Sequence, residues 1–153
     1  MRNPTIPLAS AAIALTFALT GCSGTNAPDL GALKASISSA VSGAKASADE
    51  ARTAIDKAKS TLDGLTPQTR TKVQDAITSA TTAIDKATAA LDAAKTSATA
   101  ASGTAADAET ALADARTKLD AASSTVQGAS KTALEALSTK IDDLNARLKT
   151  TQS

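Results

Sequence analysis

Large aliphatic residues are sparse in this chain after residue 28, but they recur at intervals of seven residues. The longest column runs from Ile77 to Val126, and a second column lies four residues before it, from Val73 to Ala122. Spacings of four and three residues, sustained over many heptads, indicate α-helices that pack as in a coiled coil. The two columns are Ile77, Ile84, Leu91, Ala98, Ala105, Leu112, Leu119 and Val126, and Val73, Ala80, Ala87, Ala94, Ala101, Ala108, Ala115 and Ala122.

The same period covers the rest of residues 29–153. The shortage of aromatic and β-branched aliphatic residues disfavours strands, so the pattern predicts an all-α fold. Upstream, one column is Val41, Ala48, Ile55 and Leu62, and its partner is Ile37, Ala44, Ala51, Ala58 and Leu65. Near the C-terminus the pattern continues with Leu134, Leu137, Ile141, Leu144 and Leu148.

Alanine dominates the composition, with 38 of the 153 residues, followed by 23 Thr. Ala has the best intrinsic helix propensity, and a core column of Ala lets helix axes approach at the close end of the usual 8–10 Å range. Such contacts bury little area per residue. We therefore expect the stability of the fold to depend on the length of the helices or on partner helices.

Three places in the sequence are candidate breaks between helices. Gly64, Thr66 and Pro67 predict a left-handed C-terminal residue, an N-cap and a first helical residue, in that order. Ser102-Gly103-Thr104, with Asp107 three residues after Thr104, resembles a stop followed by a capping box, although the heptads run straight through Gly103. Gly128 precedes a one-residue slip of the heptad frame and predicts a kink or turn.

These breaks predict an elongated, Ala-rich antiparallel bundle in which the helix over 29–64 folds back on the helix that begins at Pro67. If that second helix continued to Gln127, it would span roughly 90 Å, against roughly 54 Å for the first. The unpaired part would need another partner. The last helix, near 130–150, could return to cover it in a three-helix coiled-coil bundle, or a second copy of the chain could do so.

The first 22 residues have a different pattern. Arg2 supplies a positive start, and Leu8 to Thr20 form an uncharged stretch of 13 residues that is rich in Ala, Leu and Ile. That length suits the hydrophobic region of a signal peptide and is shorter than the ~20 residues of a membrane-spanning helix. The stretch ends in Leu19-Thr20-Gly21-Cys22, and Cys22 is the sole cysteine.

This ending closely resembles the bacterial lipobox. The resemblance implies that residues 1–21 are removed as a lipoprotein signal peptide and that acyl chains such as palmitate are attached to Cys22. Two or more acyl chains anchor a protein stably to a membrane. Residues 22–28 would then be the lipidated Cys and a short linker. The alternative is a secreted protein with a stray cysteine beside an ordinary cleavage site.

Cys22-Ser23 and the heptads from Leu134 to Leu148 are loosely similar to murein-lipoprotein-type envelope proteins, which combine a lipobox with an Ala-rich helix. This resemblance implies a non-enzymatic cell-envelope protein on the extracytoplasmic side of a membrane, at the cell surface or in the periplasm. This chain is roughly twice as long and contains the break near 64–67.

The composition argues against several other functions. After Phe17 there is no aromatic residue, so base-stacking nucleic-acid binding is not expected. The absence of His and the single Cys leave no common zinc or redox motif. Asp142 and Asp143 are adjacent and diverge by about 100° on a helix, so they do not share a site. We therefore expect no enzymatic activity, catalytic residue, cofactor, metal or small-molecule substrate.

Charged residues are interspersed along the helices and form spacings that favour ion pairs within one helix. Asp114–Lys118 and Asp143–Arg147 have the favourable order at four residues, and Arg116–Asp120 has the weaker order. Such pairs on a solvated face contribute a few tenths of a kcal/mol each. They predict a charged outer surface and no particular ligand.

Together these patterns predict a lipid-anchored envelope protein whose helices form a spacer or a self-associating scaffold. The alternative is a binding module at the cell surface or in the periplasm that recognises an envelope, host or phage protein. An exposed apolar or aromatic patch would favour the binding module, and the sequence offers none.

Overall fold

A computed structural model describes the backbone of residues 30–96 and 98–151, and the side chains of residues 35–96 and 103–151. Every regular element in those residues is helical, which confirms the all-α prediction. The elements are α1 (Leu30–Ser60), the short 3₁₀ turn η1 (Leu62–Gly64), α2 (Pro67–Thr96), α3 (Ala98–Ser123) and α4 (Ala129–Thr150).

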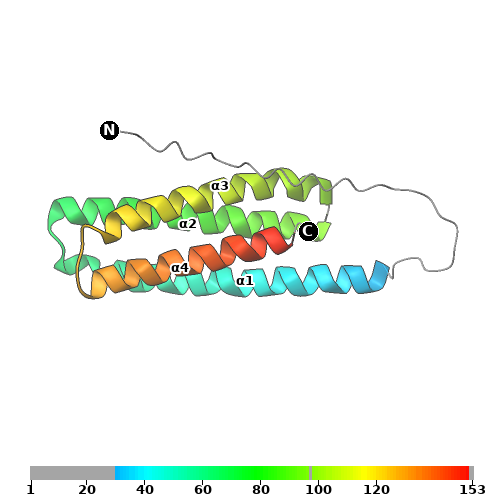
Figure 1. The fold of residues 1–153 in the computed structure, drawn as a ribbon, viewed down its shortest axis with the longest axis horizontal. Coiled ribbons are helices and arrows are strands. Elements are labelled where there is room, and N and C mark those ends of the chain that lie inside the picture. Colours follow the sequence, from blue (N-terminus) through cyan, green and yellow to red (C-terminus); the bar gives the residue numbers. More distant parts are fainter. Residues whose placement is uncertain (1–29, 97, 152–153) are drawn as a thin grey trace, which may run out of the picture.

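The four helices run alternately up and down along one long axis (Figure 1). Helix α1 packs against α2 and α4, and α3 closes the ring by packing against the same two neighbours. The contact between α2 and α3 is the most extensive, whereas α2 and α4 touch only slightly across the diagonal. The predicted elongated helical bundle is confirmed, and within the described residues it has four helices rather than two or three.

The additional helix arises because the expected helix from Pro67 to Gln127 is divided. Helix α2 ends at Thr96 and α3 begins at Ala98, so a single residue separates two antiparallel helices. The heptad columns between Leu91 and Leu112 hold only Ala, so a straight helix would bury little apolar area there. Folding back brings the large aliphatic residues of both helices into one core.

The possible break near Gly103 is not present, since this residue lies inside α3. A Cβ added to Gly103 would meet no atom within 4 Å, so neither packing nor a turn requires glycine there. The heptad frame, which runs through Gly103 without a shift, was the better guide to the local structure. The chain reverses six residues earlier, at a position that lacks Gly and Pro.

The break near 64–67 lies where the sequence places it, with Pro67 as the first residue of α2. The left-handed conformation expected of Gly64 is wrong, because among the described residues only Gly128 has a positive φ, of 64°. The chain instead leaves α1 through the 3₁₀ turn η1. The Arg70 guanidinium holds that turn by donating hydrogen bonds to the carbonyl oxygens of Leu62 (3.1 Å), Asp63 (3.2 Å) and Leu65 (3.3 Å).

The break near Gly128 is a turn between α3 and α4. Thr125 and Val126 make reverse-turn hydrogen bonds to carbonyl groups at the end of α3. Gly128, with its positive φ, directly precedes the first residue of α4. Glycine adopts this conformation without the steric cost that a Cβ would impose.

The predicted columns form the core wherever their side chains are described, with few exceptions. Ala94 is only partly buried, and the side chains of Ala98 and Ala101 lie outside the described residues. Ile37 does not join the core: it is 38% exposed, because the start of α1 extends beyond the other helices (Figure 1). The core also includes a third column in α2 that the two-column pattern missed, namely Ala76, Ala83 and Ala90.

That third column follows from the ring arrangement. A two-stranded coiled coil buries two residues in each heptad, whereas a helix between two neighbours buries a wider stripe. Helix α2 lies between α1 and α3, so its buried stripe is wide. Its small Ala side chains allow both neighbours to approach closely.

Candidate functional site

The predicted lipidation motif, Leu19, Thr20, Gly21 and Cys22, lies outside the described residues. What the structure does describe is where the chain enters the bundle. Helix α1 begins at Leu30, eight residues after Cys22, at the end that also holds the α2–α3 connection and the end of α4 (Figure 1). The α1–α2 and α3–α4 connections lie together at the opposite end, which we call the loop end.

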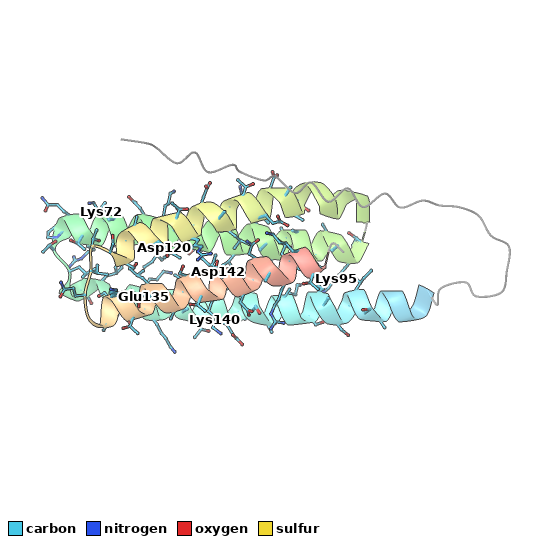
Figure 2. All side chains as sticks on the ribbon, viewed as in Figure 1. Lys72, Lys95, Asp120, Glu135, Lys140 and Asp142 are labelled. Carbon is cyan, nitrogen blue, oxygen red and sulfur yellow. The ribbon has the colours of Figure 1, made fainter. Side chains whose placement is uncertain are left out.

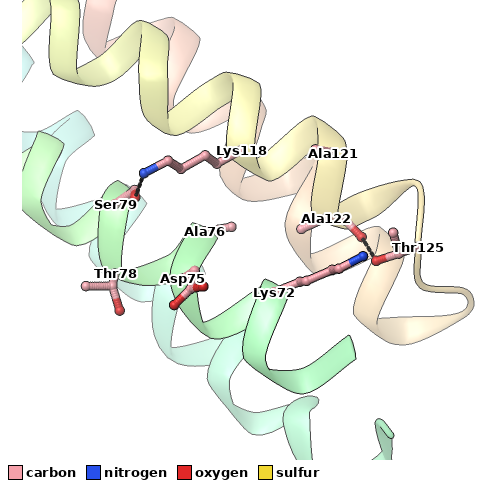
Figure 3. Close-up of a pocket in the computed structure, with 9 residues that line it drawn as sticks. All are labelled: Lys72, Asp75, Ala76, Thr78, Ser79, Lys118, Ala121, Ala122 and Thr125. Carbon is pink, nitrogen blue, oxygen red and sulfur yellow. Dashed lines mark hydrogen bonds between the residues drawn. The ribbon is translucent and has the colours of Figure 1, made fainter. Parts of the chain in front are cut away.

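An open groove of about 560 Å³ lies between α2 and α3, close to the loop end (Figure 3). Its floor is made of small side chains, because Ala76 and Ala122 are almost fully buried and leave space above them. The exposed Ala121 forms one rim. Polar and charged residues also line it, principally Lys72, Asp75 and Ser79 from α2, and Lys118 and Thr125 from α3 and the turn after it.

The two lysines of the groove come from facing helices. The Lys118 ammonium reaches across from α3 and donates a hydrogen bond of 2.8 Å to the Ser79 hydroxyl on α2. Lys72 extends from α2 in the opposite sense, toward Thr125 (Figure 3). Within the described part of the chain, neither lysine forms an ion pair with a carboxylate.

The other three contacts between neighbouring helices differ in this respect, since each is crossed by at least one ion pair. Their charged groups lie on the outer surface of the bundle, as Figure 2 shows for Lys140 and Asp142. The pairs are Lys45–Asp92 (2.5 Å) and Arg52–Asp85 (2.9 Å) between α1 and α2, Arg116–Asp142 (2.8 Å) between α3 and α4, and Lys140–Glu50 (2.6 Å) between α4 and α1.

Two of these pairs perturb titration. The hydrogen bond from Lys45 lowers the pKa of the Asp92 carboxyl below its ordinary value of 3.8, with a smaller opposing effect of desolvation. The hydrogen bond to Glu50 raises the pKa of the Lys140 ammonium above its ordinary value of 10.5. Both shifts favour the charged forms and arise from contacts between helices, so they point to structural pairing rather than to acid–base chemistry.

The adjacent carboxylates Asp142 and Asp143 diverge, as expected from their spacing. Asp142 pairs with Arg116, whereas Asp143 accepts hydrogen bonds from Ser47 (3.2 Å) and Arg147 (3.3 Å). Among the described residues there is no cluster of three or more potential metal ligands. No described helix is both long and apolar enough to cross a membrane.

The sequence did not single out the groove, because its residues are far apart in the chain. Lys118 was expected to pair with Asp114 on its own helix, but its amine instead contacts Ser79, 39 residues away. Only the reversal between Thr96 and Ala98 brings Lys72 and Lys118 to the same groove. A prediction of that reversal would have been the necessary signal.

No protein-family model, curated protein or solved structure matches this chain. Functional inference therefore depends on its own residues and geometry.

Proposed function

We propose that this protein is a non-enzymatic, lipid-anchored protein of the cell envelope, in which the bundle is a spacer outside the membrane. The observation that carries the proposal is Cys22, the sole cysteine, at the end of an uncharged 13-residue stretch that closes in Leu19-Thr20-Gly21. An acylated Cys22 would attach the membrane close to the start of α1. The loop end would then face away from the membrane.

The dimensions of the bundle support the spacer role. Helix α1 has 31 residues, which corresponds to about 46 Å at 1.5 Å per residue. The bundle would hold the loop end at about this distance from its anchored end. An Ala-rich antiparallel bundle is suited to such a task because its helices are long and each is supported by two neighbours.

Burial favours a spacer that needs no second copy over a self-associating scaffold. The heptad columns whose side chains are described are largely covered within one chain. Ile37 is the one large hydrophobic side chain exposed among them. Sedimentation equilibrium of the purified protein in a nonionic detergent should therefore give a monomer, and a stable dimer would favour the scaffold.

Metabolic labelling with an alkyne analogue of palmitate tests the anchor directly. The full-length protein should be labelled and should partition with membranes, whereas Cys22→Ala should lose both properties. Ser23→Ala is the matched control, because it changes the neighbouring residue and keeps the thiol. Equal labelling of the protein and the Cys22→Ala variant would contradict lipid attachment and favour simple secretion.

The groove provides support for the second candidate, a binding module that recognises an envelope, host or phage protein. It lies near the loop end, which the proposed anchor would direct away from the membrane. Ala121→Leu would fill this groove from an exposed position. A stoichiometric partner that binds the unaltered protein and not this variant would favour the binding module over the spacer.

A further inference from the structure

The α2–α3 groove holds an excess of positive charge that the fold itself does not neutralise. Its charged groups are the ammonium groups of Lys72 and Lys118 and the carboxylate of Asp75, which leaves one net positive charge. Lys118 contacts the neutral hydroxyl of Ser79 across the helix contact. At the other three helix contacts, cations that cross to a neighbouring helix meet a carboxylate.

The position of the two amines is suited to an anion between them. Lys72 projects from α2 and Lys118 from α3, on the two walls of the same groove (Figure 3). Lysine ammonium groups bind phosphate and carboxylate oxygens as point charges with several donors. The hydroxyl groups of Thr78 and Ser79, on the α2 wall, add further hydrogen-bonding capacity.

The shape of the groove limits the size of the ligand. A volume of about 560 Å³ falls within the range of roughly 300–1,000 Å³ that is typical of small-molecule sites. The floor formed by Ala76 and Ala122 is apolar and closed. A ligand would therefore place its charged groups at the rim, near the lysines, and an uncharged part above the alanines.

We propose that this groove binds a small molecule that carries two or more oxyanion charges, either phosphate or carboxylate. One charge is not enough, because Asp75 opposes the attraction and an exposed ion pair contributes only ~0.2–1 kcal/mol. A ligand with two charges engages both ammonium groups at once. The proposal goes beyond the spacer role and does not depend on acylation of Cys22.

The test is a titration followed by ¹H–¹⁵N NMR on the purified protein in a nonionic detergent. Inorganic pyrophosphate is the probe for phosphate and citrate is the probe for carboxylate. Either anion should shift the amide signals of the groove residues on α2 and α3, and the more tightly bound anion identifies the ligand class. Raising the salt concentration from about 0.05 M to about 0.5 M should weaken the binding, because the lysines are exposed.

Variants separate a specific site from general attraction to lysines. Lys72→Gln and Lys118→Gln should each weaken binding by up to about fivefold, and Asp75→Asn should strengthen it. Lys86→Gln is the matched control: it removes the same charge from an exposed position on α2 outside the groove, and it should leave the affinity unchanged. Ala121→Leu should abolish binding without changing charge.

Circular dichroism of each variant should give the helical spectrum of the unaltered protein, since all these substitutions except Asp75→Asn are at exposed lysines or at the exposed Ala121, and Asp75 is itself exposed. The absence of groove shifts with both anions would overturn the proposal. Equal weakening by Lys86→Gln and Lys72→Gln, or unchanged binding to Ala121→Leu, would overturn it as well, because either result means that the anion does not occupy the groove.

Discussion

Arg116 on α3 and Asp142 on α4 form an ion pair of 2.8 Å, and Ser138 donates a hydrogen bond of 3.1 Å to Asp120 between the same helices. From the first contact to the second, the chain advances four residues along α3 and returns four along α4. This is the register of two antiparallel helices that face each other at a constant offset. The two contacts thus fix the same alignment independently.

The same rule holds at two other helix contacts. Between α1 and α2, Lys45–Asp92 and Arg52–Asp85 are separated by seven residues on each helix, in opposite directions. Between α1 and α4, the contacts Ser47–Asp143 and Glu50–Lys140 are separated by three. Because the Ala columns have similar shapes from heptad to heptad, these polar contacts help to select one register among several that would pack comparably.

A double-mutant cycle on Arg116 and Asp142 should measure this contribution. Arg116→Gln and Asp142→Asn should each lower the free energy of unfolding, with a coupling energy of ~0.2–1 kcal/mol, because both side chains remain about half exposed. Urea unfolding at low salt is the measurement. A coupling energy of zero would mean that the pair does not contribute to the register.

The contact of Lys45 with Asp92 should make stability depend on acid pH. The pKa of Asp92 is lowered in the folded state, so the stabilisation is present above the unfolded pKa of about 3.9 and is lost as pH falls through the lower folded value. The difference in stability between the protein and Asp92→Asn should be constant near neutral pH and should shrink below about pH 4. A difference that persisted undiminished in acid would contradict this assignment.

The contact of Lys140 with Glu50 should act at the opposite end of the pH range. The pKa of Lys140 is raised in the folded state, so its stabilisation is present below about pH 10.4 and is lost as pH rises through the higher folded value. Lys140→Met should therefore be less stable than the protein at neutral pH. The two should converge in alkali, and Lys149→Met is a control at a more exposed position of the same helix.

Close packing of the Ala columns can be tested at Ala87, which is fully buried in α2. Ala87→Leu should lower the free energy of unfolding by about 1–3 kcal/mol, because the added side chain has no space between the helices. Ala89→Leu is the matched control at an exposed position of the same helix, where Leu is nearly as good a helix former as Ala. Thermal unfolding followed by circular dichroism gives both values. An unchanged midpoint for Ala87→Leu would show that the column is not tightly packed.

Two glycines with equal space around them should respond oppositely to substitution. An added Cβ meets nothing within 4 Å at Gly103 or at Gly128, but only Gly128 has a positive φ. Gly103→Ala should stabilise α3 by about 0.5–1 kcal/mol, whereas Gly128→Ala should destabilise the protein by about 1–2 kcal/mol. Urea unfolding of both variants distinguishes them, and stabilisation by Gly128→Ala would contradict the turn geometry.

The sequence was sufficient to predict most of the core but not the number of helices. The heptad spacing identified the buried residues because it reports directly which face of each helix is apolar, as at Leu112 and Leu119. Pro67 marked the start of α2 because its fixed φ suits the first helical turn. The reversal near residue 97 has no such residue, and a heptad pattern reads the same whether a helix continues or folds back.

Contacts between helices were also beyond the sequence. Spacing within one helix predicted Asp143–Arg147 and Arg116–Asp120, which the structure contains. It also predicted Asp114–Lys118, but Lys118 instead contacts Ser79 on α2. Pairing across helices depends on the register and order of the helices around the bundle. The groove was not predicted for the same reason.

The reversal between α2 and α3 is central to both the bundle and the groove, and one distance tests it most directly. Spin labels can be placed at Lys72→Cys and Thr125→Cys in the Cys22→Ala background, and their separation measured by double electron–electron resonance. Both residues line the same groove, so the labels should lie within about 20 Å, given helix axes about 8–10 Å apart. A continuous helix from 72 to 125 would place them about 80 Å apart, and a distance in that range would contradict the four-helix bundle.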